Sequence, residues 1–115
     1  MKQVGIISYN AGNTRSLINS FEKINFRPKL INEPNDLKNL EHIVLPGVGA
    51  FRECILNLKK NRTLPIIIEK IKTKKIFFLG ICLGMQMLFD KSEEFEMTEG
   101  LHLLEGKVQK LKINK

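Results

Sequence analysis

The sequence predicts an α/β fold in which helices flank an open, mostly parallel sheet. Short apolar runs of strand length alternate with segments of helical periodicity, which is typical of parallel strands joined by helical crossovers. Three of these runs, ending at Ser8, Leu45 and Leu79, lead into turns that contain glycine. Ligands of open α/β sheets bind beyond the carboxyl ends of the strands, so we expect the functional site at that edge.

The first half of the chain alternates in this way from its start. The apolar run 4–8 predicts a buried strand, and residues 9–13 predict a turn in which Asn13 caps a helix. That helix carries its apolar side chains on one face, and two strands follow with a short helix between them. The expected helix-face residues are Leu17, Phe21 and Ile24, then Leu37 and Leu40, and the expected strands are 29–31 and 43–45.

The second half continues the alternation around a continuous apolar run. Residues 76–79 predict a central parallel strand that is buried on both faces. Two helices precede it and one follows it, and the tail 106–113 alternates like a strand. The expected inward faces are Phe51, Cys54, Ile55 and Leu58, then Ile67, Ile68 and Ile71 within 64–72, then Met85, Leu88 and Phe89.

Length and composition limit the class of protein. The chain is long enough for one domain, 1–115, and no apolar run reaches the roughly 18 residues of a membrane span. The start lacks a signal-peptide layout and two cysteines are too few for a disulfide framework, so we expect a cytoplasmic protein. The net charge of +7 comes mostly from scattered lysines without interleaved aromatic residues. We therefore expect no nucleic-acid or membrane partner, and the Cys/His spacing predicts no metal or cofactor.

Cys82 is the strongest candidate for a catalytic residue. The run Gly80-Ile81-Cys82-Leu83-Gly84 joins an apolar strand to a helix, which is the layout of a nucleophile elbow with cysteine in place of serine. The turn is tight, so we expect side chains at positions 80 and 84 to collide with the neighbouring strand and helix. Helix N–H groups near the thiol favour the thiolate, and the Leu83 N–H is a candidate oxyanion donor. The alternative is a small buried cysteine in a glycine-rich turn.

A second glycine-rich turn, Pro46-Gly47-Val48-Gly49, also joins a strand to a helix. Its glycines let the backbone approach a ligand and leave N–H groups free. The turn is a candidate for a phosphate cradle or for the second half of an oxyanion hole, with a plain strand-to-helix turn as the alternative. It is not a P-loop, because no Gly-Lys-Ser/Thr follows. Cys54, on the next helix, is expected in the core.

Together these motifs resemble those of the class I glutamine amidotransferases. The resemblance rests on Gly-Ile-Cys-Leu-Gly-Met-Gln at 80–86, Pro-Gly-Val-Gly-Ala-Phe at 46–51 and Asn-Ala-Gly-Asn at 10–13, and it spans nearly the whole chain. Within that family, Met85 and the Pro-Gly-Val-Gly turn are similar to the glutaminase subunits of imidazole glycerol phosphate synthase. Anthranilate- and carbamoyl-phosphate-type relatives usually have His and Gly-Gly-Pro-Gly at these places.

The resemblance implies a flavodoxin-like α/β sheet that carries a glutaminase site. Cys82 would attack the side-chain amide of glutamine, and the N–H groups of Leu83 and of residues 47–49 would form the oxyanion hole. Gln86 and the two glycines of that turn would hold the substrate. The ammonia would pass to a (β/α)8-barrel cyclase in a heterodimer, which makes imidazole glycerol phosphate and an aminoimidazole carboxamide ribotide in histidine biosynthesis. In the family, the valine backbone of the turn is poorly placed for catalysis until the partner binds its own ligand.

The resemblance also implies a catalytic His and Glu in an H-P-E-like motif, and this sequence has no such motif. His42 opens a strand, and we expect it at the surface or the strand edge. His102 precedes Glu105 with the wrong spacing and no intervening proline, so we do not expect it to be the base. We therefore expect the N-terminal part of such a domain, C-terminally incomplete, and weakly active or inactive alone.

Two other functions fit the same residues. A paralogous amidotransferase that supplies ammonia to a surface-sugar pathway would carry an identical elbow. A non-catalytic remnant that docks a barrel partner would keep the fold and leave Cys82 inert.

Overall fold

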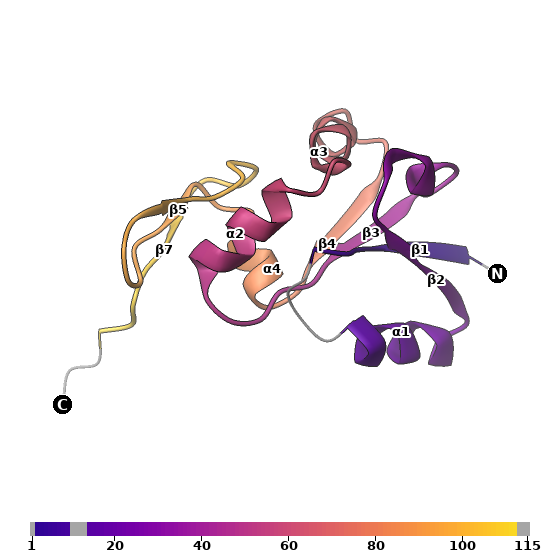
Figure 1. The fold of residues 1–115 in the computed structure, drawn as a ribbon, viewed down its shortest axis with the longest axis horizontal. Helices are drawn as coiled ribbons and strands as arrows, with labels where there is room; N and C mark the ends of the chain where they lie inside the picture. Colours follow the sequence, from indigo (N-terminus) through magenta and orange to yellow (C-terminus); the bar gives the residue numbers. More distant parts are fainter. Residues whose placement is uncertain (1, 10–13, 113–115) are drawn as a thin grey trace.

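The computed structural model describes residues 2–9 and 14–112 and confirms the α/β class (Figure 1). Four parallel strands form the main sheet in the order β2-β1-β3-β4. Their bounds are Lys2–Ile7 (β1), Phe26–Ile31 (β2), His42–Leu45 (β3) and Phe77–Gly80 (β4). All four carboxyl ends therefore share one edge of the sheet. The expected cap at Asn13 lies outside the described residues.

Helices cover the two faces of this sheet unequally (Figure 1). Helix α1 (Thr14–Lys23) lies on one face and has no fully buried residue. The other face carries the 3-10 helix η1 (Pro34–Leu37) and helices α2 (Phe51–Lys59) and α3 (Leu64–Lys72). None of the helices in the described part of the chain is long and apolar enough to cross a membrane. The core on the α2 and α3 side takes Ile7, Ile31 and Leu45 from the strands, and it takes Phe51, Cys54, Ile55, Leu58 and Ile67 from the helices, as the helical patterns predict. The expectation for Ile24 is wrong, because α1 ends before it and its side chain is 61% exposed.

Strand β4 lies at the edge of the sheet, and the prediction of a central strand buried on both faces is wrong. Its side chains alternate: Phe77 is 71% exposed and Leu79 is 52% exposed, while Phe78 packs against the core. Helix α1 packs on the β2 side, and no strand among the described residues pairs with the outer edge of β4. An apolar groove of about 160 Å³ consequently opens beside β4, lined in part by Phe21.

Only one helical turn follows Cys82. Helix α4 spans Leu83–Gln86, whereas the apolar pattern predicts a helix that also contains residues 88 and 89. The helix ends because the carbonyls of residues 87–89 accept hydrogen bonds from the N–H groups of residues 101–104. Met85, which lies within α4, is 43% exposed, so its expected inward-facing position is wrong, while Met87 is fully buried.

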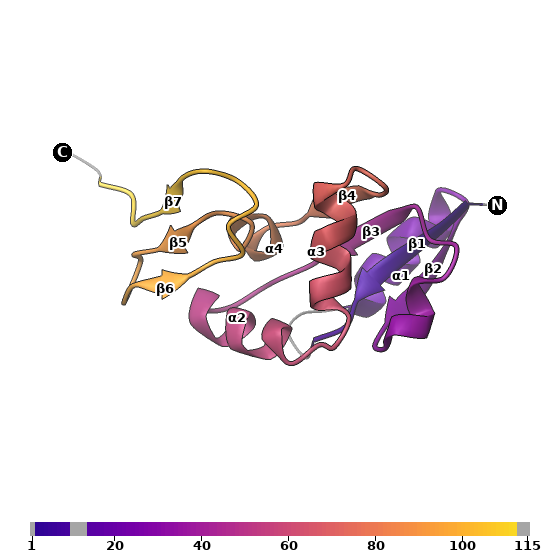
Figure 2. The ribbon, with the colours of Figure 1, turned by 90° about the horizontal axis from the view of Figure 1, so that it is seen from above.

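The C-terminal segment forms a small second sheet in the order β6-β5-β7. Its strands are Lys91–Ser92 (β5), Thr98–Glu99 (β6) and Lys107–Val108 (β7), and Figure 2 shows them at the end of the molecule opposite the N-terminus. Within the described part of the predicted tail strand 106–113, only Lys107–Val108 pairs with β5, so the strand is shorter than expected. Residue 113 of that prediction lies outside the described residues. Leu111, beyond β7, is 85% exposed.

Candidate active site

Cys82 lies at the carboxyl edge of the main sheet, between β4 and α4. Its φ of 54° and ψ of −121° place a non-glycine residue in a sparsely populated and strained region of backbone space. The residue is exposed, so the alternative of a buried structural cysteine does not apply. A sharp strand-to-helix turn that presents an exposed thiol has the geometry of a nucleophile elbow.

The glycines on either side of Cys82 make this turn sterically possible. A Cβ atom on Gly84 would lie 2.0 Å from the carbonyl oxygen of Leu45 in β3. A Cβ atom on Gly80 would lie 2.7 Å from the Cα atom of Met85 in α4. These are the collisions with the neighbouring strand and helix that the motif predicts, so the turn excludes side chains at both positions.

The Pro46–Gly49 turn lies beside the elbow because β3 pairs with β4. The Leu83 N–H donates a hydrogen bond to the carbonyl oxygen of Gly47 at 3.2 Å. A Cβ atom on Gly47 would lie 2.7 Å from the Gly84 nitrogen, so the two glycine motifs touch. The N–H group that the sequence predicts as an oxyanion donor is therefore engaged by the turn in this conformation.

Two side chains from the core hold the same turn. The Tyr9 hydroxyl donates to the carbonyl of Pro46, and the Cys54 thiol donates to the carbonyl of Val48 at 3.3 Å. Cys54 is 2% exposed, which confirms its expected place in the core, and Tyr9 is 6% exposed. Burial raises the pKa of the Cys54 thiol. Burial, with a smaller contribution from Cys54, also raises the pKa of the Tyr9 hydroxyl.

One pocket of about 460 Å³ brings the predicted site residues together. Its lining contains Gly47, Val48, Gly49, Cys82, Leu83 and Gln86. Sequence reasoning did not assign a site role to Phe51, Glu94 and Phe95, which complete the lining. Phe51 is a buried residue at the start of α2, whereas Phe95 is 89% exposed on the segment between β5 and β6. No periodicity or glycine motif marks Glu94 and Phe95, because only the path of the small sheet brings them to the pocket.

Neither of the two histidines in the sequence lines this pocket. His42 opens β3, at the strand end opposite the glycine turn, and its ring stacks on Phe77 with centroids 5.3 Å apart. His102 lies beside the small sheet, where its ring nitrogens contact Asp90 and Glu99. Hydrogen bonds that the His102 ring donates to Asp90 and then to Glu99 raise the pKa of His102 above its ordinary value. The structure thus gives neither imidazole a place beside the thiol.

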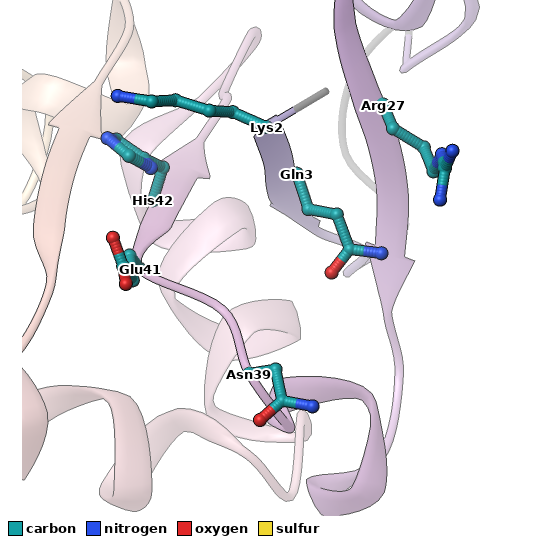
Figure 3. A pocket seen from close by; sticks show the side chains of 6 residues that line it. All are labelled: Lys2, Gln3, Arg27, Asn39, Glu41 and His42. Atoms are coloured by element: carbon teal, nitrogen blue, oxygen red, sulfur yellow. The ribbon is translucent and has the colours of Figure 1, made fainter.

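A second, polar pocket lies at the amino ends of the strands (Figure 3). Lys2 and Gln3 enter it from β1, Arg27 from β2 and His42 from β3. In Figure 3, His42 lies alongside Lys2, while Arg27 lies beyond Gln3 on the other side. This pocket is at the opposite edge of the sheet from Cys82 and contains no cysteine, so it is separate from the nucleophile.

The chemistry available in the Cys82 pocket comes from one thiol, the Glu94 carboxylate, nearby backbone amides and the Gln86 side chain. Among residues 2–9 and 14–112, no group of three or more His, Cys, Asp or Glu side chains is placed to hold a metal ion. An exposed thiol beside a backbone that can offer N–H groups is suited to attack on a carbonyl carbon.

A parallel α/β sheet with an exposed cysteine on a sharp turn at its carboxyl edge, faced by a glycine-rich turn, defines the class of this protein as an α/β protein with a thiol-containing pocket at that edge. The sequence matches the family Glutamine amidotransferase class-I over residues 6–114, and the chain belongs to that family. The resemblance and the fold class drawn from the sequence are both confirmed.

The curated relatives include several subunits of one synthase. "Imidazole glycerol phosphate synthase subunit HisH" of Geobacter metallireducens is 42% identical over 108 residues, which cover 94% of this chain and 51% of that protein. "Imidazole glycerol phosphate synthase hisHF" of Emericella nidulans is 39% identical over 110 residues, covering 96% of this chain and 20% of that protein. The chain spans about half the length of the HisH relatives it matches.

Solved structures share the fold. The chain in "Crystal structure of glutamine amidotransferase" superposes with a TM-score of 0.78 at 17% identity, over 92% of this chain and 55% of that chain. A putative peptidase E protein from Listeria monocytogenes superposes with a TM-score of 0.61 at 17% identity, over 78% of this chain and 50% of that chain. At these identities the likeness shows the fold alone.

Proposed function

We propose that this chain supplies the cysteine nucleophile of a glutaminase, which hydrolyses glutamine to glutamate and ammonia for an imidazole glycerol phosphate synthase. Family membership supports the reaction class, and the HisH relatives support the choice of synthase. The observation that carries the proposal is the pocket in which the exposed Cys82 meets the glycine turn 47–49.

The Cys82 thiolate begins the reaction by attacking the side-chain amide carbon of glutamine. A C–S bond forms and the carbonyl oxygen becomes an oxyanion; the C–N bond then breaks, and ammonia leaves with a proton from a general acid. Water then gives a proton to a general base and attacks the resulting γ-glutamyl thioester, so that a C–O bond forms, the C–S bond breaks, and glutamate leaves as the Cys82 thiolate is regenerated. Gln86 and the glycines of the turn hold the substrate in the pocket.

The oxyanion needs N–H donors, and the resting conformation withholds one of them. The Leu83 N–H is bonded to the carbonyl of Gly47 at 3.2 Å. Rotation of the single peptide between Gly47 and Val48 would free this N–H and turn the Val48 N–H toward the same place. The resting site is then weak until the turn rearranges, which fits control by a (β/α)8-barrel cyclase partner that consumes the ammonia.

The general base of this reaction comes from outside residues 1–115 in our proposal. Both histidines of the chain have other surroundings, since His42 stacks on Phe77 and His102 contacts Asp90 and Glu99. A cysteine without its base loses most of its catalytic rate, because the members of a triad act as a unit.

Labelling with a chloroketone analogue of glutamine tests the proposal. The Cys82 thiolate displaces chloride and forms a stable C–S bond, and free glutamine should protect it. We expect the unmodified chain to be labelled completely at Cys82, and we expect no labelling of Cys82→Ser. Cys54→Ala should also be labelled completely at Cys82 when the reaction is allowed to finish. Equal modification of Cys54 and Cys82, or labelling that glutamine does not slow, would contradict the proposal.

A non-catalytic role is the second candidate, and the pocket without a histidine favours it. In that case the chain docks a barrel partner and Cys82 is inert. Glutamine-protected labelling separates the two roles, because an inert cysteine in an open pocket would react at the same rate with and without glutamine.

A further inference from the structure

Two buried, protic side chains beside the candidate site have no part in the chemistry proposed above. Tyr9 follows β1, and Cys54 lies on α2, so they approach the 46–49 turn from two different elements. Tyr9 is 6% exposed and Cys54 is 2% exposed. A tyrosine hydroxyl can donate a strong hydrogen bond and a thiol a weak one, and buried groups of this kind normally have partners.

Their partners are backbone carbonyls on either side of one peptide. Tyr9 donates to the carbonyl of Pro46, and Cys54 donates to the carbonyl of Val48 at 3.3 Å. Between these two carbonyls lies that of Gly47, which accepts from the Leu83 N–H at 3.2 Å. Each of these three consecutive carbonyls therefore accepts a hydrogen bond from a described residue.

The three donors to these carbonyls are of two kinds. The donors to Pro46 and Val48 are side chains fixed in the core, whereas the donor to Gly47 is the backbone N–H that the proposed reaction needs for its oxyanion. A peptide can rotate about the line between its flanking Cα atoms while its two neighbours stay in place. Only the middle carbonyl must move if Leu83 is to be released, and the outer two define the axis about which it moves.

We propose that Tyr9 and Cys54 are positioning residues that hold the peptides flanking Gly47–Val48, so that this one peptide can rotate between its bond to Leu83 and an oxyanion-binding orientation. This inference rests on the proposed function and names the side chains that hold the 46–49 turn in position beside Cys82. N–H donors that are held in place stabilise an oxyanion strongly, whereas donors whose position varies stabilise it much less.

The protonation of the pair suits the role. Burial raises the pKa of the Cys54 thiol, and burial first, then the neighbouring Cys54, raises the pKa of the Tyr9 hydroxyl. Both groups therefore keep the proton that they donate at neutral pH. The position of Gly47 adds a steric condition, because a Cβ atom there would lie 2.8 Å from the Tyr9 oxygen.

The experiment uses Cys54→Ala and Cys54→Ser as a matched pair, with Tyr9→Phe as an independent variant. Serine keeps a protic donor of similar size, whereas alanine and phenylalanine remove the donor. The maximal rate of Cys82 modification is measured with the chloroketone analogue of glutamine and with methyl methanethiosulfonate, a small thiol reagent with no carbonyl. Amide hydrogen exchange at Leu83 is measured in the same proteins, with Ile6 in β1 as a reference for global stability.

We expect Cys54→Ala and Tyr9→Phe to slow the chloroketone reaction about threefold to tenfold, the range set by one lost neutral hydrogen bond. The methanethiosulfonate rate should stay within about twofold, since that reagent develops no oxyanion. In these variants, amide hydrogen exchange at Leu83 should become faster by about the same factor by which the chloroketone reaction becomes slower. The exchange rate at Ile6 should not change. Cys54→Ser should restore both values most of the way.

Unchanged Leu83 exchange and an unchanged chloroketone rate in Cys54→Ala would overturn the positioning role. A parallel fall in both reagent rates, or no rescue by serine, would overturn it as well, since either would indicate general damage to the pocket. The exchange measurement needs no glutamine chemistry. Failure of glutamine-protected labelling in the unmodified chain would thus reject the proposed function, while Leu83 exchange still decides whether the two side chains hold the turn.

Discussion

The Leu83 N–H donates to the Gly47 carbonyl at 3.2 Å and thereby joins the nucleophile elbow to the glycine turn of the neighbouring strand. The two motifs are separated in sequence but adjacent in the sheet, because β3 and β4 pair directly. The contact has two consequences: it fixes the turn beside Cys82, and it occupies the amide that the proposed reaction needs.

The first prediction concerns the glycines of the two motifs. Gly84→Ala should destabilise the fold by about 3 kcal/mol or more, because its Cβ atom would lie 2.0 Å from the Leu45 carbonyl oxygen. Gly49→Ala is the matched control: its φ is +100°, and nothing lies within 4 Å of the added atom. Only backbone strain of about 1–2 kcal/mol is expected there. Urea unfolding measures both, and equal losses would contradict the steric account.

Glutamine turnover by the isolated chain should be very slow. The pocket holds a nucleophile, but both histidines of the chain lie elsewhere. Loss of the base from a triad lowers kcat by roughly 10⁴-fold or more. We expect ammonia release at least about a thousandfold slower than that of the HisH of Geobacter metallireducens assayed with a cyclase subunit. A rate within tenfold of that relative would show that a base exists within residues 1–115.

The exposed edge of β4 should promote self-association. Phe77 is 71% exposed and Leu79 is 52% exposed on a strand whose outer edge pairs with no strand in residues 2–9 and 14–112, and exposed apolar edge strands are templates for association. Leu79→Lys should reduce the sedimentation-derived association of the chain at high concentration. Leu56→Lys is the control, since Leu56 is also 52% exposed but lies on α2. An equal effect of the two variants would show that general surface charge, not the strand edge, is responsible.

The small sheet should depend on pH through His102 and Asp90. Hydrogen bonds first to Asp90 and then to Glu99 raise the pKa of His102 above 6.5, so its contribution is complete below that value and is lost as pH rises through the raised pKa. The Gly106 N–H and His102 lower the pKa of Asp90 below 3.8, so its contribution is present above that value and is lost as pH falls through the lowered pKa.

The small sheet should therefore be most stable at mildly acidic pH. Amide protection of Lys91 and Ser92, which pair with β6 and β7, should be greater at about pH 6 than at about pH 8. His102→Gln should remove this difference, and so should Asp90→Asn in large part. Protection that rises with pH in the unmodified chain would contradict the role of the imidazole. NMR titration of the His102 ring gives a direct check on the direction of its pKa shift.

The elbow and the sheet could be predicted from the sequence because their signals are local. An apolar strand, two glycines around a cysteine and a following helix start are contiguous, and the glycine clashes with Leu45 and Met85 explain the spacing. The sequence also predicts that residues 47–49 lie close to Cys82 and Gln86, because the strands of a parallel sheet end at one edge.

Other features depend on partners that lie far away in the sequence. The apolar residues of β4 do not reveal that it is an edge strand, because a strand with neighbours on both sides has the same pattern. The short α4 results from carbonyls of residues 87–89 that bond to residues 101–104. The bond between Leu83 and Gly47 depends on the orientation of one peptide, which residue types do not fix. Tyr9 lacks any motif that would mark its contact with Pro46.

The most direct test of the central claim uses an activated γ-glutamyl ester with a nitrophenolate leaving group. Cys82 attacks the γ-carbonyl carbon, the C–S bond forms, the C–O bond breaks, and nitrophenolate leaves without needing a proton. Hydrolysis of the thioester then stalls for lack of a base. We predict a burst of a single equivalent of nitrophenolate, with the glutamyl group on Cys82, and no burst in Cys82→Ser. Absence of a burst in the unmodified chain, or the same burst in Cys82→Ser, would contradict the assignment of Cys82 as the nucleophile.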